Sequence, residues 1–386
     1  MRIGLIVNEV SGDQLASALI QALRERVPDI EFEGMTGPLM EAAGCKSLAR
    51  MDPVMGLTEV LGHLPGLLKT RRRLIAHFLQ NPPDLVLGVD APDFNLALET
   101  RLKAAGIKTV HFVSPTVWAW RQGRVKGLRD AVDLMLCIFD FEVPFLTANG
   151  VPAVYVGHPM ADQIPLQPAD TGTVRRTLGL DEQAPVVALL PGSRMSEVSR
   201  LGEIFARTAA WLKSRRPEVQ FVAPMVNETV REHFQQQWQV ANPGCDVLLL
   251  EGRARDAMAA ADVVLVASGT ATLETLLMKK PMVVGYRLAP LTAWIIFRFK
   301  LLKTPHVAIA NLLSEQPLAP ELLQQECRVE RLGPALLELL DDPERRAAIA
   351  QHYQAIHQGL RRDAAAQAAE AILQCLGRGA STQSSL

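Results

Sequence analysis

A carboxylate at the end of an apolar run is the group in this sequence best suited to proton transfer. Asp90 follows the run 85–89 and precedes Pro92, whose ring fixes the backbone of the next turn. A carboxylate there can accept the proton of a substrate hydroxyl, which is the task of a general base in group transfer to an alcohol. Asp93 and Asn95 follow in the same segment, where the alternative is that they cap the next helix.

A second segment is suited to binding an anion or a sugar hydroxyl. Glu9-Val-Ser-Gly-Asp13 follows the apolar run 3–7 and opens a helical pattern. Gly12 permits close approach of the backbone, and the free N–H groups of a helix N-terminus attract anions. The segment lacks the Gly-x-Gly-x-x-Gly spacing of a dinucleotide site, and the alternative is that Ser11 or Asp13 caps the helix.

An irregular loop rich in aromatic residues follows the run 109–113. It contains Trp118, Trp120 and Arg121, which are costly on a loop unless they pack or bind a ligand. The alternative is that the tryptophans only cover the end of the sheet. His111, inside the apolar run, is expected to be a hydrogen-bonded core residue.

Two loops in the second half of the chain have the composition of phosphate sites. Leu190-Pro-Gly-Ser-Arg194 and Ala267-Ser-Gly-Thr-Ala-Thr-Leu-Glu274 each follow an apolar run and begin a helix. Their backbone N–H groups and hydroxyls, with the Arg194 guanidinium, can bind a pyrophosphate, and Glu274 can accept hydrogen bonds from ribose hydroxyls. Turns and helix caps are the alternative. No Asp-x-Asp metal clamp accompanies the loops, so Arg194 and helix dipoles would neutralise a leaving diphosphate.

Strands and helices that alternate along both halves of the chain must position these segments. Continuous apolar strands separated by helices indicate parallel sheets buried on both faces. Strands are expected at 3–7, 31–35, 85–89, 109–113, 134–138, 153–156, 186–190, 219–223, 247–250, 263–267 and 282–285, and helices at 13–27, 95–105, 198–214, 255–260 and 271–279. We predict an α/β fold of two doubly wound domains whose strand carboxyl ends face a shared cleft, because open sheets of this kind bind ligands there.

The length of 386 residues allows two or three domains. The Pro- and Gly-rich stretch 162–173 is the expected linker. This gives an N-terminal domain 1–162, a C-terminal domain 174–342, helices within 343–376 and a disordered tail 377–386. The helices either pack back on the N-terminal domain or are exchanged between two protomers of a homodimer.

Composition narrows the class of protein. Lys and Arg total 40 against 41 Asp and Glu, a net charge of -1 that argues against a general nucleic-acid binder. Mean hydropathy is +0.11, yet no run reaches the ~18 apolar residues of a membrane span. The first apolar run is too short for the hydrophobic region of a signal peptide. The five cysteines and eight histidines form no zinc or disulfide pattern. A cytoplasmic protein is expected.

Taken in order, the motifs resemble those of lipid-A-disaccharide synthases, which are inverting glycosyltransferases of the GT-B fold. The likeness spans about residues 1–375 and includes the five segments above, Gly157-His158 and Asn311-Leu-Leu313. It implies UDP-2,3-diacylglucosamine as donor and 2,3-diacylglucosamine 1-phosphate (lipid X) as acceptor. The implied products are the β(1→6)-linked disaccharide of lipid A and UDP, and no metal or other cofactor is expected.

The resemblance also implies roles for individual residues. Asp90 would deprotonate the acceptor 6-hydroxyl, which then attacks the anomeric carbon in a single displacement. The implied UDP-binding residues are Gly192, Ser193, Arg194, Ser268, Gly269, Thr270, Glu274, Asn311, Glu321 and Gln325, the last two on an expected helix. The acceptor side would comprise Glu9, Ser11, Gly12, Asp13, Asp93, Trp118 and Arg121. Asn8 and Val10 depart from the family, which commonly has Gly and Ala there.

Both lipid substrates lie in a membrane, so we expect peripheral association with the cytoplasmic face of the inner membrane. Segments 61–79 and 294–303 interleave apolar and cationic residues, as in helices that lie at an anionic bilayer surface. The expected contacts in the first segment are Leu64, Leu67, Leu68, Lys69, Arg71 and Arg72. The alternative is that both segments are buried helices with solvated cationic edges.

Two other functions stay open at this point. A UDP-sugar 2-epimerase shares the architecture, but it would need further acid/base groups and would leave the cationic segments unexplained. A non-catalytic UDP-sugar-binding protein at the membrane would bind the nucleotide sugar without forming product.

Overall fold

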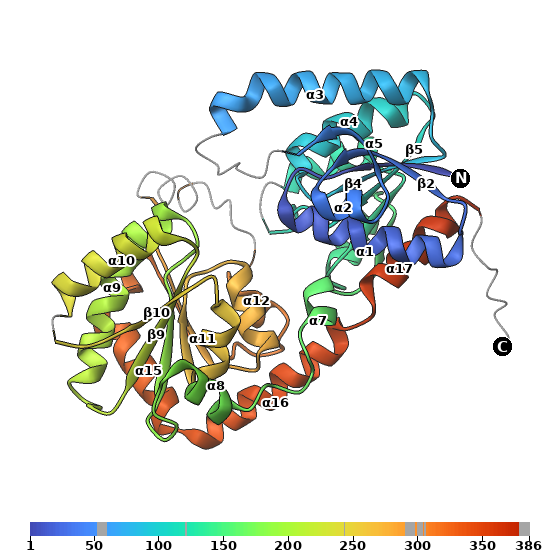
Figure 1. The fold of residues 1–386 in the computed structure, drawn as a ribbon. Helices are drawn as coiled ribbons and strands as arrows, with labels where there is room; N and C mark the ends of the chain where they lie inside the picture. The colour runs from blue at the N-terminus through green and yellow to red at the C-terminus, as the bar shows by residue number, and fades with distance from the viewer. Residues whose placement is uncertain are drawn as a thin grey trace, which may run out of the picture. The chain divides into compact units, whose positions relative to one another are not determined.

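The computed structural model describes residues 1–51, 60–119, 122–242, 244–289, 298, 304 and 306–377, without the side chains of 60–64 and 122. The chain divides into two compact units. The first comprises Met1–Asp162 and Leu360–Leu386, and the second comprises Gln163–Gly359. Each unit has a central sheet covered by helices (Figure 1).

The first unit is built on a seven-stranded parallel sheet of order β3-β2-β1-β4-β5-β6-β7. Its strands are β1 Arg2–Ile6, β2 Glu31–Thr36, β3 Lys46–Arg50, β4 Leu85–Val89, β5 Lys108–Phe112, β6 Leu134–Cys137 and β7 Ala153–Tyr155. Its helices are α1 Val10–Arg26, α2 Pro38–Ala42, α3 Val60–Gln80, α4 Pro92–Ala104, η1 Gln122–Arg124, α5 Val125–Ala131, α6 Glu142–Ala148, α7 Pro159–Gln163 and α17 Ala364–Cys375. The order reverses between β1 and β4, which makes the carboxyl ends of these two strands the expected ligand position.

The second unit has a six-stranded parallel sheet of order β10-β9-β8-β11-β12-β13. Its strands are β8 Val186–Leu190, β9 Gln220–Met225, β10 Leu248–Glu251, β11 Val263–Val266, β12 Met282–Tyr286 and β13 Glu321–Leu323. Its helices are α8 Thr171–Leu178, α9 Met195–Lys213, α10 Glu228–Ala241, α11 Ala254–Ala260, α12 Thr270–Leu277, α14 Ile309–Leu312, η2 Gln324–Glu326, α15 Val329–Asp341 and α16 Pro343–Leu360. Here the order reverses between β8 and β11.

Every expected strand is present, with ends that differ by one or two residues. Two further strands, β3 and β13, were not expected. β3 has the sequence Lys-Ser-Leu-Ala-Arg and no buried residue, so it lacks the apolar signal of a central strand. Glu321 and Gln325 were expected on a helix, and this is wrong: β13 extends the edge of the sheet at Glu321, and Gln325 lies in the short η2 turn.

The last part of the chain returns to the first unit, where α17 packs against α1 (Figure 1). The Gly157-His158 motif makes room for this return. Gly157 has φ +92°, and a Cβ there would lie 2.7 Å from the Cβ of Arg362. The backbone N–H of His158 donates to Leu360 O at 2.9 Å. This motif therefore docks the returning segment.

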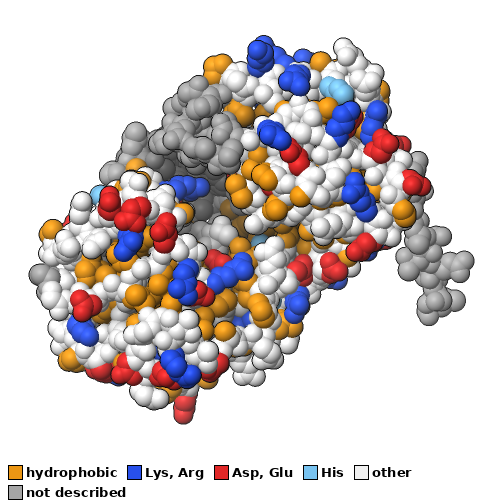
Figure 2. Space-filling model, viewed as in Figure 1, with side chains coloured by type: hydrophobic (Ala, Val, Ile, Leu, Met, Phe, Trp, Pro, Cys, Tyr) orange, Lys and Arg blue, Asp and Glu red, His pale blue; other side chains and the backbone are white. Residues whose placement is uncertain are grey.

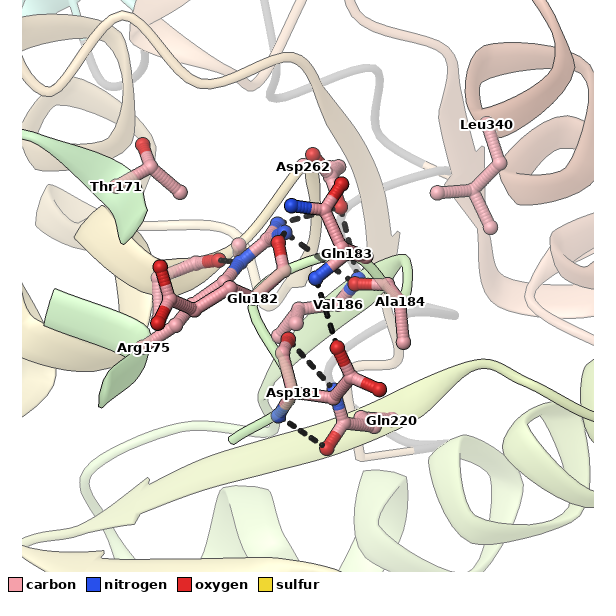
Figure 3. Close-up of polar contacts among 12 residues, drawn as sticks. Thr171, Arg175, Asp181, Glu182, Gln183, Ala184, Val186, Gln220, Asp262 and Leu340 are labelled. Carbon is pink, nitrogen blue, oxygen red and sulfur yellow. Dashed lines mark hydrogen bonds and ion pairs between the residues drawn. The ribbon is translucent and has the colours of Figure 1, made fainter. Parts of the chain in front are cut away.

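Charged side chains of both signs are scattered over the visible surface of each unit (Figure 2), in keeping with the net charge of -1. One charged network instead centres on a buried arginine, Arg175, at the amino ends of β8 and β11 (Figure 3). Arg175 of α8 donates to Asp262 Oδ2 at 2.7 Å and to the carbonyls of Ala260 and Glu182 at 2.8 and 3.0 Å. Asp262 also accepts from the backbone N–H of Val186. Since ligands bind at the opposite, carboxyl ends of the strands, we interpret this network as structural.

Candidate functional site

A pocket opens in the first unit beside the carboxyl ends of β4 and β5. Its volume is about 290 Å³. The residues that line it come from the segments after these two strands and from η1: Asp90, Pro92, Asp93, Val113, Ser114, Pro115, Thr116, Val117 and Arg124. The strand end that was expected to carry a base thus borders a cavity.

Asp90 sits in a backbone turn that is held from two sides. Asp90 and Ala91 both have left-handed backbones, with φ +53° and +43°, which cost non-glycine residues about 1–2 kcal/mol each. The Asp90 N–H donates to Phe112 O at 2.8 Å. The Nδ2 of Asn95, a fully buried side chain, donates to Asp90 O at 2.8 Å and to Val89 O at 3.3 Å. Asn95 therefore reaches back to fix the turn, whereas the sequence suggested a helix cap.

A buried pair of side chains supports this turn from inside the unit. Glu99 Oε1 lies 2.9 Å from His111 Nδ1, and both side chains are fully buried. His111 is the hydrogen-bonded core residue that the sequence predicts. Gly88 lets α4 approach the strand, because a Cβ at this position would overlap Glu99 and lie 2.9 Å from the Cβ of Asn95.

Arg124 brings a positive charge to the same pocket. Its Nη2 donates to Asp93 Oδ1 at 2.6 Å, and the Asp93 side chain is 88% exposed. Asp93 lies in the first turn of α4, and Arg124 ends η1. The sequence instead predicts that Arg121 lies on the acceptor side. Arg121 and Trp120 lie outside the described residues.

The predicted acceptor residues after β1 divide into two groups. Glu9 and Ser11 are exposed, whereas Gly12 and Asp13 are buried. Both oxygens of Asp13 accept backbone N–H groups at 2.9 Å, from Leu39 and Met40. The side chain thus caps α2, and the expectation that it faces the acceptor is corrected.

Trp118 is anchored by a buried carboxyl group. Its Nε1 donates to Glu142 Oε1 at 3.2 Å, and its ring meets Phe141 edge-on at 4.8 Å. Glu142 Oε2 accepts from the backbone N–H of Phe139 at 3.1 Å. Burial raises the pKa of Glu142 to about 7. The Trp118 side chain is thus half-buried and held in place within the first unit.

In the second unit the two loops expected to bind phosphate follow β8 and β11, at the reversal of strand order. They start side by side, because Ala267 N donates to Leu190 O at 2.8 Å. The N–H groups of Ser193 and Arg194 donate to Glu197 Oε2 at 3.1 and 3.3 Å. The loop therefore already binds one anionic oxygen. The sequence interpretation gave Glu197 no role, although an acidic residue three positions after the N-cap residue of a helix is typical of a capping box.

The loop after β11 is more open. Gly269 has φ +142°, and a Cβ there would meet nothing within 4 Å. Gly269 and Thr270 are exposed, and Ser268 Oγ donates to Val307 O at 3.4 Å. Glu274 lies 2.8 Å from Arg255 Nε, so its carboxylate has a partner within the unit.

Asn311 and Glu321 hold the backbone near the Ser268 loop. Asn311 is buried, its Oδ1 accepts from the N–H groups of Leu318 and Ala319 at 2.9 Å, and its Nδ2 donates to Glu321 Oε1 at 2.7 Å. Glu321 Oε2 accepts from Val307 N at 2.9 Å. Both side chains therefore shape a loop. Gln325 is exposed.

Helix α3 contains the first cationic segment. Leu74 and Phe78 are buried, and Leu67 packs partly against the same core. Lys69 and Arg72 are exposed, and Leu68 and Arg71 are half-buried. Lys and Arg side chains gather along the edge of the first unit where α3 lies (Figure 2). The Leu64 side chain and, apart from Arg298 and Thr304, segment 290–305 lie outside the described residues.

Two features are absent from the described part of the chain. Within them, no helix is long and apolar enough to cross a membrane. Among the same residues, no group of three or more His, Cys, Asp or Glu side chains could hold a metal ion.

Comparison with known sequences gives a consistent family. Residues 3–375 match the family described as lipid-A-disaccharide synthetase. The lipid-A-disaccharide synthase of Alkalilimnicola ehrlichii is 50% identical over 366 residues, which cover 94% of this chain and 95% of that protein. The enzyme of the same name from Pseudomonas aeruginosa is 50% identical over 365 residues, with the same coverage.

Solved structures with low identity share the fold. A putative UDP-N-acetylglucosamine 2-epimerase from Listeria monocytogenes has a TM-score of 0.65 at 15% identity, covering 97% of this chain and 96% of that one. The UDP-GlcNAc 2-epimerase from Neisseria meningitidis, bound to UDP-GlcNAc, has a TM-score of 0.63 at 13% identity, covering 97% and 100%. MurG from Acinetobacter baumannii has a TM-score of 0.58 at 14% identity, covering 97% and 99%. The predicted two-domain GT-B architecture is confirmed.

Proposed function

This chain belongs to the lipid-A-disaccharide synthase family, and from that premise we propose which of its residues carry the reaction. The chain is a glycosyltransferase: it transfers 2,3-diacylglucosamine from UDP-2,3-diacylglucosamine to the 6-hydroxyl of 2,3-diacylglucosamine 1-phosphate. The products are the β(1→6)-linked lipid A disaccharide 1-phosphate and UDP. The configuration at the anomeric carbon is inverted.

Asp90 is the proposed base. Its carboxylate accepts the proton of the acceptor 6-hydroxyl while that oxygen attacks the anomeric carbon and the bond to the diphosphate breaks. One displacement inverts the configuration and needs one base. The observation that carries this assignment is the fixed left-handed turn, which presents Asp90 to the pocket at the reversal of strand order. A group held in advance at the reacting position does not have to be ordered during the reaction.

The second unit is the proposed UDP site. The support is that its loop after β8 already binds a carboxylate oxygen through the N–H groups of Ser193 and Arg194, and a phosphate oxygen makes the same bonds. In the Neisseria meningitidis structure of this fold, UDP-GlcNAc is bound. The proposed contacts are Gly192, Ser193, Arg194, Ser268, Gly269 and Thr270.

Of the remaining predicted UDP-binding residues, two are proposed to contact the nucleotide and two to shape a loop beside it. Glu274 accepts a hydrogen bond from a ribose hydroxyl once its ion pair with Arg255 opens. Gln325 contacts the nucleotide directly. Asn311 and Glu321 act through the loop that they shape. Arg194 and the helix N-termini offset the charge of the leaving diphosphate without a metal ion.

The acceptor, whose phosphate and sugar enter the pocket beside Asp90, is proposed to be bordered by Glu9, Ser11, Trp118 and Arg121.

Helix α3 is the proposed contact with the cytoplasmic face of the inner membrane, through its exposed cations and the half-buried Leu68. Sedimentation with anionic liposomes tests this contact. Lys69→Glu with Arg72→Glu is expected to reduce the bound fraction at low salt, whereas Arg129→Glu on α5 is the control. Equal sedimentation of both variants and the parent would count against α3.

Release of UDP from a mixture of UDP-2,3-diacylglucosamine and lipid X tests the catalytic proposal. Asp90→Asn is expected to lower kcat at least ~100-fold, within the usual contribution of a general base, and to leave UDP binding unchanged. The exposed Asp130→Asn is the control. No release by the parent would refute the acceptor and donor. Full activity of Asp90→Asn would refute only the assignment of the base, and product-free UDP binding by the parent would favour a non-catalytic protein.

A further inference from the structure

We propose that Arg124 binds the 1-phosphate of the acceptor in the pocket that contains Asp90. This inference rests on the proposed function, because it takes the acceptor to lie with its 6-hydroxyl at Asp90. It assigns to the pocket a second anchor for the substrate and makes the phosphate a requirement for tight binding.

The charges that line the pocket lead to this assignment. Asp90 and Asp93 are acidic, and Arg124 is the one cation among the described residues of the lining. A phosphate monoester entering between two carboxylates without a cation would be repelled. Arg124 is therefore the described group that allows a negatively charged acceptor to reach the base.

The present partner of Arg124 shows what the guanidinium is placed to bind. Its Nη2 donates to one carboxylate oxygen of Asp93 at 2.6 Å, in a pair whose side chains are 39% and 88% exposed. Exposed pairs of this kind contribute little stability, so a ligand can replace Asp93 easily. A phosphate offers three oxygens and matches the forked donors of a guanidinium through two parallel bonds.

The shape of the acceptor fits a single pocket. In a glucosamine 1-phosphate, C1 and C5 are both bonded to the ring oxygen, so the phosphate and the 6-hydroxyl lie toward the same edge of the sugar. A volume of about 290 Å³ is close to the lower end of small-molecule sites, about 300 Å³. It suits a sugar phosphate headgroup, with the acyl chains outside.

Two acceptors and two variants test the inference. UDP release is measured against the concentration of lipid X and of 2,3-diacylglucosamine that lacks the phosphate, in mixed micelles. Arg124→Gln is expected to raise the KM for lipid X about 10- to 100-fold, as for loss of a charged hydrogen bond. The KM for the phosphate-free acceptor and for the donor is expected to stay within about twofold, and Arg124→Lys to recover part of the loss.

The matched control is Arg129→Gln, which removes a nearby exposed arginine that pairs with Asp130. A parent that does not discriminate between the two acceptors, or an Arg124→Gln variant that loses both equally, would overturn the inference. A change in donor KM alone would place the bound phosphate in the nucleotide instead. Equilibrium binding of lipid X to parent and Arg124→Gln gives the same comparison without turnover.

Failure of the proposed function gives a different pattern. If Asp90→Asn keeps full activity while Arg124→Gln loses the preference for the phosphate, the base is wrong and the phosphate site stands. If the parent binds lipid X no better than the phosphate-free lipid, the phosphate site is wrong whatever Asp90 does.

Discussion

Replacing Asn95 should weaken the first unit locally and also disturb the position of its proposed base. In Asn95→Ala the carbonyl oxygens of Asp90 and Val89 lose the bonds from Nδ2, at 2.8 and 3.3 Å. Each buried acceptor left without its partner costs about 1–3 kcal/mol. The left-handed backbone at Asp90 and Ala91 then has less to hold it in place. We expect local destabilisation of about 2–4 kcal/mol, allowing for partial relaxation and access of water.

Hydrogen exchange of the backbone amides around β4 measures this loss. Because a chain of two units need not unfold in one step, a local probe is better than a single melting temperature. A loss of ~2–4 kcal/mol corresponds to exchange that is roughly 30- to 1,000-fold faster. The turnover number is expected to fall about tenfold or more, while the KM for the donor stays within about twofold.

Two variants decide whether the donor group of Asn95 matters or only its volume. Asn95→Asp keeps the shape but places an acceptor against two carbonyl oxygens, so its activity should be low at pH 8 and partly recovered at acid pH, where the carboxyl can donate. Asn149→Ala removes an exposed amide that donates to Phe145 O at 2.8 Å and serves as the control. The positioning argument fails if Asn95→Ala keeps the parent turnover number, or if Asn95→Asp matches the parent at pH 8.

Three further outcomes are expected. Arg175→Met should destabilise the second unit by about 2–4 kcal/mol, because the partly exposed Asp262 carboxylate loses its cation and the carbonyls of Ala260 and Glu182 lose a buried donor; a thermal melt no different from that of Arg176→Met, which removes the exposed partner of Glu182, would contradict this. Burial raises the pKa of Glu142 to about 7 from an ordinary 4.5, so its contribution to stability is complete below pH 4.5 and is lost as the pH rises through 7. Melts of Glu142→Gln across this range should show a shallower decline with pH, and parallel curves would show that Glu142 does not titrate there. Glu197→Gln should tighten UDP binding about three- to tenfold, since a neutral group replaces the anion on the Ser193 and Arg194 N–H groups; weaker binding by calorimetry would mean that the carboxylate shapes the loop.

The strands and the place of the base could be predicted from sequence because both depend on local signals. Continuous apolar runs mark central parallel strands, and the carboxyl end of such a run is where Asp90 was sought. β3 could not be found in this way, since an edge strand with charged ends has no apolar run.

Side-chain partners far apart in sequence could not be predicted. Asp13 caps a helix that begins 25 residues later, at Pro38, and nothing around Asp13 distinguishes this from a contact with substrate. Similarly, Asn95 reaches the turn only because Gly88 lets α4 approach the sheet closely. Arg124 could not be predicted either, because it lies outside the aromatic motif that contains Arg121 and its pocket forms only when the unit folds.

The return of α17 to α1 has a consequence for synthesis of the chain. The second unit is one continuous stretch, Gln163–Gly359, whereas the first needs both Met1–Asp162 and the segment from Leu360. Domains generally fold as they leave the ribosome, the N-terminal one first. Here we expect the second unit to complete its core first. The apolar surface of α1 stays uncovered until Ala368 and Ile372 of α17 have been synthesised. A nascent chain stalled before α17 should therefore recruit chaperones through its earliest-made domain.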